Sequence, residues 1–192
     1  MKRTAHIADY LQPLKDKPLQ SYLTNTLQVA DVLEWVLEQV GPAEVWQTSF
    51  SISEEFLRRL YFLQQRHPVK AFHLVLDHKA TNKTLKLWMF IDQVIKDTYL
   101  ADNHSKLILV KSSSPLGEAG EGVCIPCVSI ITSQNLTRGN RNESALVTTD
   151  PQVFATLYAS VVDLIENHAI PISDCIREAM EGGDKQQTSS SS

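Results

Sequence analysis

The spacing of apolar residues divides the chain into helical and extended segments. Between Gln20 and Val40 apolar side chains recur at steps of three or four, which predicts a helix over this range. Gly41-Pro42 follows and is typical of a helix end. The other expected helices cover 54–67, 85–99, 151–166 and 169–180, and the expected strands cover 44–51, 70–77, 104–111, 123–132 and 144–148.

Helices and strands alternate along most of the sequence. This order predicts an α/β fold, with a mixed β-sheet flanked by helices on both faces. We expect residues 20–168 to form one domain. Residues 1–19 are polar and interrupted by two prolines, so we expect an extended N-terminal arm. Residues 169–192 are expected to hold a short helix and then a disordered Ser-rich tail.

Composition and charge narrow the class of protein. The 192 residues are 43% hydrophobic and 21% charged, which is ordinary for a soluble globular protein. The formal net charge of -4 argues against a broadly basic nucleic-acid coat but leaves room for a local basic site. The sequence has neither a secretory signal nor the roughly 18 uninterrupted apolar residues of a membrane span. We therefore expect a cytoplasmic protein without membrane contact.

Five polar residues between 104 and 143 have the chemistry that a phosphodiester requires. His104 and Lys106 are two apart in an expected strand and would share one face. Ser133 and Asn135 follow an apolar strand, and Glu143 precedes the next one. An imidazole can attack phosphorus, while lysine, amide and hydroxyl groups bind the non-bridging oxygens. A carboxylate can orient the imidazole through its other nitrogen.

Three short motifs, taken in their order along the chain, resemble the active-site signature of the phospholipase D superfamily of phosphodiesterases. They are His104-Ser105-Lys106, Thr132-Ser133-Gln134-Asn135 and Asn142-Glu143. The resemblance covers about residues 20–168 and implies a phospholipase D-like α/β/α sandwich. It also implies metal-independent hydrolysis through a phosphohistidine intermediate, with no cofactor.

The chain departs from this signature at two positions. Lys111 stands where the family has an aspartate, and Thr132 stands where it has a glycine. The first departure keeps two alternatives open. The chain is either an active phosphodiesterase or a catalytically impaired module that binds nucleic acid or a protein partner. A regulatory domain of a larger defence or restriction system is a third possibility.

The sequence holds a single His-x-Lys motif, whereas members of the family use two. The resemblance therefore implies a homodimer with a shared active site, in which one His104 is the nucleophile and the other the general acid. Among single-motif members it favours a nuclease acting on DNA or RNA over a lipase. Three basic residues near the motifs are expected to bind substrate phosphates: Lys111, Arg138 and Arg141.

Cys124 and Cys127 form a C-x-x-C pair within an expected strand. Half of a zinc site and a redox pair are two possible interpretations. A zinc site lacks a good second pair of ligands, and a redox pair is expected to open a helix. Buried thiols that behave as small apolar side chains are the favoured interpretation.

Overall fold

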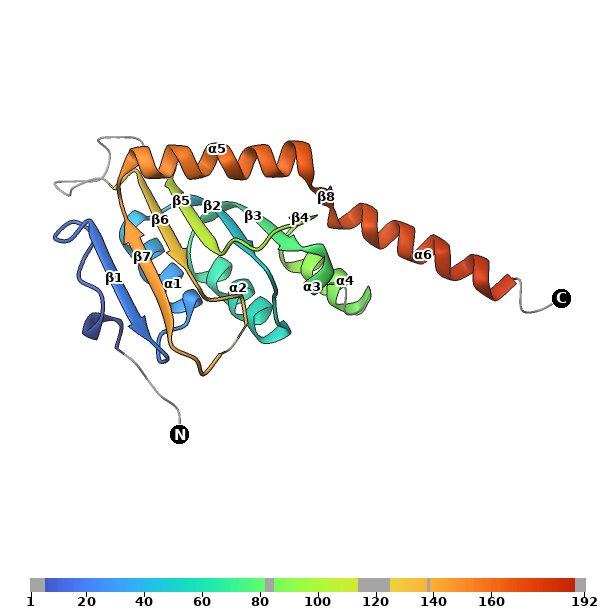
Figure 1. Ribbon diagram of the computed structural model, residues 1–192, viewed down its shortest axis with the longest axis horizontal. Coiled ribbons are helices and arrows are strands. Elements are labelled where there is room, and N and C mark those ends of the chain that lie inside the picture. The colour runs from blue at the N-terminus through green and yellow to red at the C-terminus, as the bar shows by residue number, and fades with distance from the viewer. Residues whose placement is uncertain (1–5, 82–84, 114–124, 138, 189–192) are drawn as a thin grey trace.

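The computed structural model describes residues 6–81, 85–113, 125–137 and 139–188, with the backbone alone for 80, 81 and 182–188. These residues form a mixed eight-stranded sheet with helices on both faces (Figure 1). The α/β fold class predicted from the order of the elements is therefore confirmed.

The strand order in the sheet is β1-β7-β6-β5-β2-β3-β4-β8. The helices and strands of the described residues follow one another in chain order. They are η1 (Ile7–Asp9), β1 (Leu19–Thr24), α1 (Val29–Val40), β2 (Ala43–Ser49), α2 (Glu54–Arg66), β3 (Val69–Asp77), α3 (His78–Thr81), α4 (Leu85–Val94), β4 (Asp97–Ala101), β5 (Leu107–Ser112), β6 (Cys127–Thr132), β7 (Glu143–Thr148), α5 (Pro151–His168), β8 (Ile170–Pro171) and α6 (Ile172–Thr188).

The sheet has a parallel part and an antiparallel part. Strands β2, β3 and β4 run parallel, and the crossovers between them contain α2 and then α3 and α4. Strands β5, β6, β7 and β1 continue the sheet from β2 with antiparallel pairing. The antiparallel part brings the start of β5, the end of β6 and the start of β7 to the same end of the sheet.

The two faces of the sheet are covered unequally. One face packs against α1, α2, α4 and the start of α6 and forms the larger core. The other face packs against α5 in a smaller cluster. Fully buried residues of the larger core include Leu33, Leu57, Leu60, Leu74 and Ile108, and the smaller cluster is built on Trp46, Leu109, Cys127, Phe154 and Val161.

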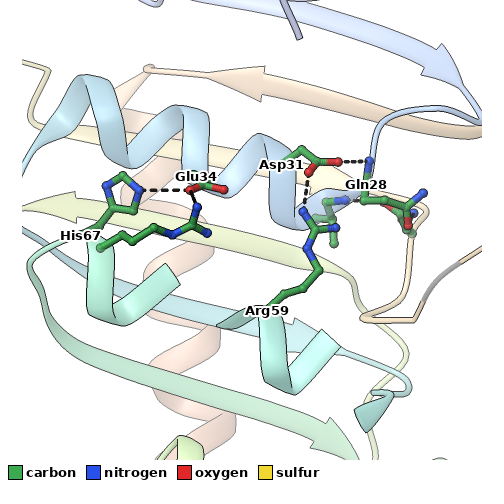
Figure 2. A network of polar contacts seen from close by, with 8 residues as sticks. Gln28, Asp31, Glu34, Arg59 and His67 are labelled. Atoms are coloured by element: carbon green, nitrogen blue, oxygen red, sulfur yellow. Dashed lines mark hydrogen bonds and ion pairs between the residues drawn. The ribbon is translucent and has the colours of Figure 1, made fainter. Parts of the chain in front are cut away.

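Polar contacts join the exposed sides of α1 and α2 (Figure 2). Asp31 pairs with Arg59, and its other oxygen accepts a hydrogen bond from the backbone N–H of Gln28 at 2.9 Å. One turn further along α1, Glu34 lies 3.4 Å from the His67 ring nitrogen. These contacts fix α1 and α2 side by side at the end of α1 that faces the 133–135 segment.

The predicted helix over Gln20–Val40 is wrong in its first half. Residues Leu19–Thr24 form strand β1, which pairs antiparallel with β7. Alternate residues of this segment, Gln20, Tyr22 and Thr24, are buried, so the period of two and the pairing with β7 override the helical spacing. The expected extended arm also packs, because Leu11 and Leu14 are buried in the larger core.

Three further boundaries differ from those predicted. The helix predicted over 85–99 ends at Val94, because Asp97–Ala101 pairs with β3 as strand β4. The strand predicted over 123–132 begins at Cys127 within the described residues. The helix predicted over 169–180 is longer: α6 runs from Ile172 to Thr188, so the part of the tail expected to be disordered from 182 to 188 is helical.

The start of α6 explains this extension. Ile172 is fully buried, and the following turn packs against the larger core through Cys175 and Ile176. A packed first turn supplies the costly nucleus from which a helix propagates. Figure 1 shows α6 continuing past the edge of the sheet. In the described part of the chain, none of the helices combines the length and the apolar character that crossing a membrane requires.

Candidate active site

A cleft of about 570 Å³ opens where β5 begins and β6 ends. Leu107 and Ile131, which are paired across these two strands, line it together with Leu157 of α5. Polar side chains from the segments that flank the strands complete it. The lining residues are His104, Ser105, Lys106, Leu107, Ile131, Thr132, Ser133, Asn135 and Leu157.

His104 and Lys106 lie in the segment between β4 and β5, just before the strand that the sequence predicted for them. The Lys106 ammonium donates to the His104 carbonyl oxygen at 2.8 Å and lies 3.4 Å from the His104 Nδ1 atom. Both side chains line the cleft. The predicted pairing of an imidazole with an ammonium is therefore present, although it comes from an extended loop and not from a strand.

Phe50 is a neighbour of this pair that the sequence did not indicate. Its ring lies 4.9 Å from the His104 ring, and the Lys106 ammonium lies 5.9 Å from the centre of the Phe50 ring. An aromatic face at these distances favours a cation electrostatically. Phe50 comes directly after β2, and no motif in the sequence marks it.

Ser133 and Glu143 contact each other across the ends of β6 and β7. The Ser133 hydroxyl donates to a Glu143 carboxylate oxygen and accepts from the Ser144 backbone N–H at 3.1 Å. Among the described residues, Glu143 makes no hydrogen bond to His104. Within one subunit, the carboxylate therefore holds the Ser133 hydroxyl and does not orient the imidazole.

Asn135 is a further polar residue at the cleft. Its side-chain oxygen lies 3.4 Å from the hydroxyl of Ser49, a buried residue at the end of β2. The Ser49 hydroxyl also accepts from the Leu136 backbone N–H at 3.1 Å. These contacts tie the segment after β6 to the end of β2, so Asn135 lies beside the cleft from a fixed backbone.

Of the three basic residues expected to bind phosphates, the two that the structure describes do not line the cleft. Lys111 is at the opposite end of β5, where its ammonium lies 6.0 Å from the centre of the Tyr158 ring. Arg141 is exposed in the segment before β7 and is not a lining residue. Arg138 lies outside the described residues. The structure thus brings together His104, Lys106, Ser133 and Asn135, with Glu143 behind Ser133.

Cys127 is buried beneath α5 in the smaller cluster. Burial, with a smaller contribution from Asp150, raises the pKa of its thiol. The described environment therefore keeps Cys127 protonated and apolar, while Cys124 lies outside the described residues. In the described part of the chain, histidine, cysteine and carboxylate side chains form no group of three or more that could hold a metal ion.

Comparison with known proteins identifies the fold. No family model and no curated protein matches the sequence. The phospholipase D family member Nuc from Salmonella typhimurium superposes with a TM-score of 0.52 at 15% identity, over 78% of this chain and 95% of Nuc. NucT from Helicobacter pylori superposes with a TM-score of 0.55 at 12% identity, over 78% of this chain and 98% of NucT.

A larger enzyme contains the same fold in part. The polyphosphate kinase from Porphyromonas gingivalis superposes with a TM-score of 0.57 at 13% identity, over 82% of this chain but 29% of the kinase. Identities this low establish the fold and leave the reaction to be argued from the site. The fold implied by the three motifs is confirmed: the chain has the phospholipase D fold.

Proposed function

We propose that the protein is a metal-independent phosphodiesterase of the phospholipase D type that hydrolyses nucleic acid. The observation that carries this proposal is the convergence of His104, Lys106, Ser133 and Asn135 on one cleft. Nucleophile, cation and neutral hydrogen-bonding groups lie there together, in the motif order that resembles the family signature. The fold that the chain shares with Nuc supports the same conclusion.

The first chemical step is attack on phosphorus by a neutral His104 imidazole. A phosphorus–nitrogen bond forms, and the bond between phosphorus and the leaving oxygen breaks with its electron pair going to that oxygen. A general acid donates a proton to the leaving oxygen. The Lys106 ammonium and the Asn135 amide are placed to stabilise the charge on the non-bridging oxygens.

The second step returns the enzyme to its starting state. The group that gave up its proton takes one from water, and the resulting hydroxide attacks phosphorus while the phosphorus–nitrogen bond breaks. Both steps need a second acid–base group opposite His104. Among the described residues of one subunit, no other histidine lines the cleft.

A second copy of the chain would supply that group in a shared active site. Apolar side chains next to the cleft support this arrangement. Ile131 and its cross-strand partner Leu146 are 39% and 38% exposed, and Leu23 on the neighbouring strand β1 is 70% exposed. Exposed apolar side chains on one contiguous sheet surface are typical of an interaction site. We propose that this surface contacts the same surface of a second subunit around a two-fold axis.

Nucleic acid is the proposed substrate because a phosphodiester between two large groups needs an open site. The cleft opens at the end of the sheet and is lined by polar and apolar side chains together. Lys106 supplies one positive charge for each subunit, so a shared cleft carries two. Lys111, Arg138 and Arg141 remain predicted contacts to more distant phosphates.

Turnover in the presence of a chelator tests the proposal. Wild-type protein with EDTA is incubated with plasmid DNA, single-stranded DNA, RNA and bis-p-nitrophenyl phosphate. We expect hydrolysis that His104→Ala abolishes, because His104 is the only histidine among the described residues that line the cleft. Quenching with alkaline denaturant, which preserves the acid-labile phosphorus–nitrogen bond, should trap label from a phosphorus-labelled substrate on the wild-type protein and none on the variant.

His168→Ala is the matched control. His168 is an exposed histidine in the last turn of α5 and is not a lining residue of the cleft. Its loss should leave turnover unchanged. Absence of turnover by wild type with every substrate would exclude the catalytic proposal. Retained binding of DNA in that case would support the impaired, binding alternative.

A further inference from the structure

Each half of the cleft has a buried amide directly beside its site residues. Asn103 precedes His104, and Gln134 lies between Ser133 and Asn135. The two amides are 6% and 3% exposed, whereas His104 and Ser133 are exposed. Each amide is hydrogen-bonded to a backbone group of another element, and the residue next to it in the chain lines the cleft.

Asn103 is bonded on both sides of His104. Its side-chain N–H donates to the Ser49 carbonyl oxygen at 3.3 Å, and its oxygen accepts from the Ser105 backbone N–H at 3.1 Å. Its own backbone N–H donates to the buried carboxylate of Asp77 at 3.2 Å. The residues before and after His104 are therefore fixed to β2 and β3. This holds the His104 backbone in one place, and with it the starting point of the imidazole side chain.

Gln134 does the same for the second half of the cleft. Its side-chain oxygen accepts from the Val29 backbone N–H at 2.6 Å, and its amide N–H donates to the Gln28 side-chain oxygen at 3.1 Å. Both partners lie at the start of α1. Its backbone N–H donates to the Thr132 hydroxyl at 3.1 Å. The segment that carries Ser133 and Asn135 is thus attached to a helix end.

This helix end is itself fixed by charged groups. Figure 2 shows Gln28 beside Asp31, and Asp31 beside Arg59 of α2. The Gln28 backbone N–H donates to Asp31, and the Asp31 carboxylate pairs with Arg59. Gln134 therefore does not contact a mobile surface group. It contacts a helix start that is connected through Asp31 to a second helix of the larger core.

We propose that Asn103 and Gln134 are positioning residues that set the geometry of the two halves of the active site independently. Asn103 sets the His104 imidazole, and Gln134 sets the Ser133 hydroxyl and the Asn135 amide. The kinetic part of this proposal rests on the proposed phosphodiesterase function, while the geometric part does not. Neither amide is expected to touch the substrate, because both are buried below the lining residues.

Two apolar substitutions of similar size test the proposal. Asn103→Leu and Gln134→Met each remove the bonds of one amide. Imidazole nitrogen spectra of the full-length protein should show a shifted or broadened His104 signal in Asn103→Leu and an unchanged one in Gln134→Met. Side-chain amide spectra should show a shifted or broadened Asn135 signal in Gln134→Met and an unchanged one in Asn103→Leu. These two readouts need no catalysis.

Kinetics provide the second readout. With bis-p-nitrophenyl phosphate, we expect each variant to lose about 10- to 100-fold in kcat with a smaller change in KM, because misplacement by about 1 Å affects the reacting geometry most. Gln134→Glu keeps the acceptor for the Val29 N–H and should recover part of the loss. A wild type without turnover would remove this readout together with the proposed function, and the spectra would still decide the geometric part.

Gln20→Met is the matched control for instability. Gln20 is a buried amide, 4% exposed, that donates to the carbonyl oxygens of Gln12 and Lys17 at 2.7 and 2.9 Å, away from the cleft. Its loss should lower the melting temperature to a similar degree with unchanged His104 and Asn135 signals and unchanged kcat. Equal spectral and kinetic changes in all three variants would overturn the proposal, as would unchanged site signals in Asn103→Leu and Gln134→Met.

Discussion

The two faces of the sheet differ in how completely they are covered, and the candidate site lies beside the less covered one. The first face packs against α1, α2, α4 and the start of α6 in one large core. On the second face, α5 is the covering helix among the described elements, and the apolar side chains Leu23, Ile131 and Leu146 are left exposed. The larger core therefore stabilises the fold, while the second face leaves room for the cleft and for the proposed contact with a second subunit.

The difference also explains how a small chain builds a rigid site. The residues that fix the cleft reach through the sheet edge to the larger core: Gln134 bonds to α1, and Asn103 bonds to β2 and β3. Two apolar residues of the cleft, Leu107 and Leu157, pack against the smaller cluster on the other face. A well-packed face thus supports side chains whose own surroundings are open, which is how preorganised sites are generally built.

The largest expected effect is a difference in stability between matched leucine substitutions on the two faces. Leu60→Ala on α2 should lower the free energy of unfolding by about 3 to 5 kcal/mol, because Leu60 is fully buried and leaves a cavity. Leu157→Ala on α5 should cost about 1 to 2 kcal/mol, because this side chain is half-buried at the cleft. Urea unfolding of both variants measures the difference. Equal losses in the free energy of unfolding would contradict the conclusion that the two faces of the sheet are covered unequally.

Much of the fold could be predicted because strong local signals agreed with tertiary packing. The helix expected over 54–67 is present, and Ser53 begins it by accepting from the Phe56 N–H at 3.2 Å. Asp150 likewise begins α5, accepting from Gln152 and Val153. The helix predicted over Leu19–Thr24 is wrong for a physical reason. The leucines there have helical spacing, but the segment pairs with β7 as a strand, and this pairing buries every second residue.

The candidate site was predictable as far as chemistry and chain order define it. His104, Lys106, Ser133 and Asn135 converge as expected, since the ends of adjacent strands meet at one end of the sheet. Lys111 does not, because five residues of extended strand place it at the far end of β5. Phe50 could not be predicted, since its place beside His104 depends on the β2–β5 pairing and on no local pattern.

A second, smaller effect depends on pH and belongs to the larger core. Burial, with smaller contributions from Asp31 and Glu143, raises the pKa of Tyr22 from 10.0 to about 12. Between these two values the unfolded chain loses the Tyr22 proton first, so the free energy of unfolding falls as pH rises. The contribution is complete below pH 10 and amounts to about 2 to 3 kcal/mol.

Unfolding by urea at several pH values from 9 to 12 measures this effect. Tyr22→Phe should remove that part of the pH dependence, because phenylalanine does not titrate. Tyr61→Phe serves as the control, since Tyr61 is exposed on α2. The same slope in wild type and Tyr22→Phe would show that Tyr22 is not kept protonated by burial.

A third comparison uses the helix caps of the two faces. Ser53→Ala on α2 and Asp150→Ala on α5 each remove a side-chain acceptor from a helix start and should each cost about 1 kcal/mol. The consequences for the cleft should differ, because Leu157 of α5 is one of its lining residues. We expect Asp150→Ala to raise KM for bis-p-nitrophenyl phosphate and Ser53→Ala to leave it unchanged. The same KM in Asp150→Ala and Ser53→Ala would show that the geometry of the cleft does not depend on the cap at the start of α5.

The smallest effect on stability is expected at the exposed end of the second face. Leu23 is 70% exposed, so Leu23→Ser should change the free energy of unfolding of the subunit by less than about 0.5 kcal/mol. Its effect on association should be much larger if this surface contacts a second subunit, because the side chain then loses buried apolar contact.

Sedimentation at several protein concentrations should show wild-type dimers and a shift toward monomers for Leu23→Ser and Leu146→Ser. Phe62→Ser, at an exposed apolar position on the opposite side of the molecule, should leave the dimer intact. Dimers that resist both second-face substitutions but dissociate in Phe62→Ser would place the subunit contact on the well-covered side and separate it from the cleft.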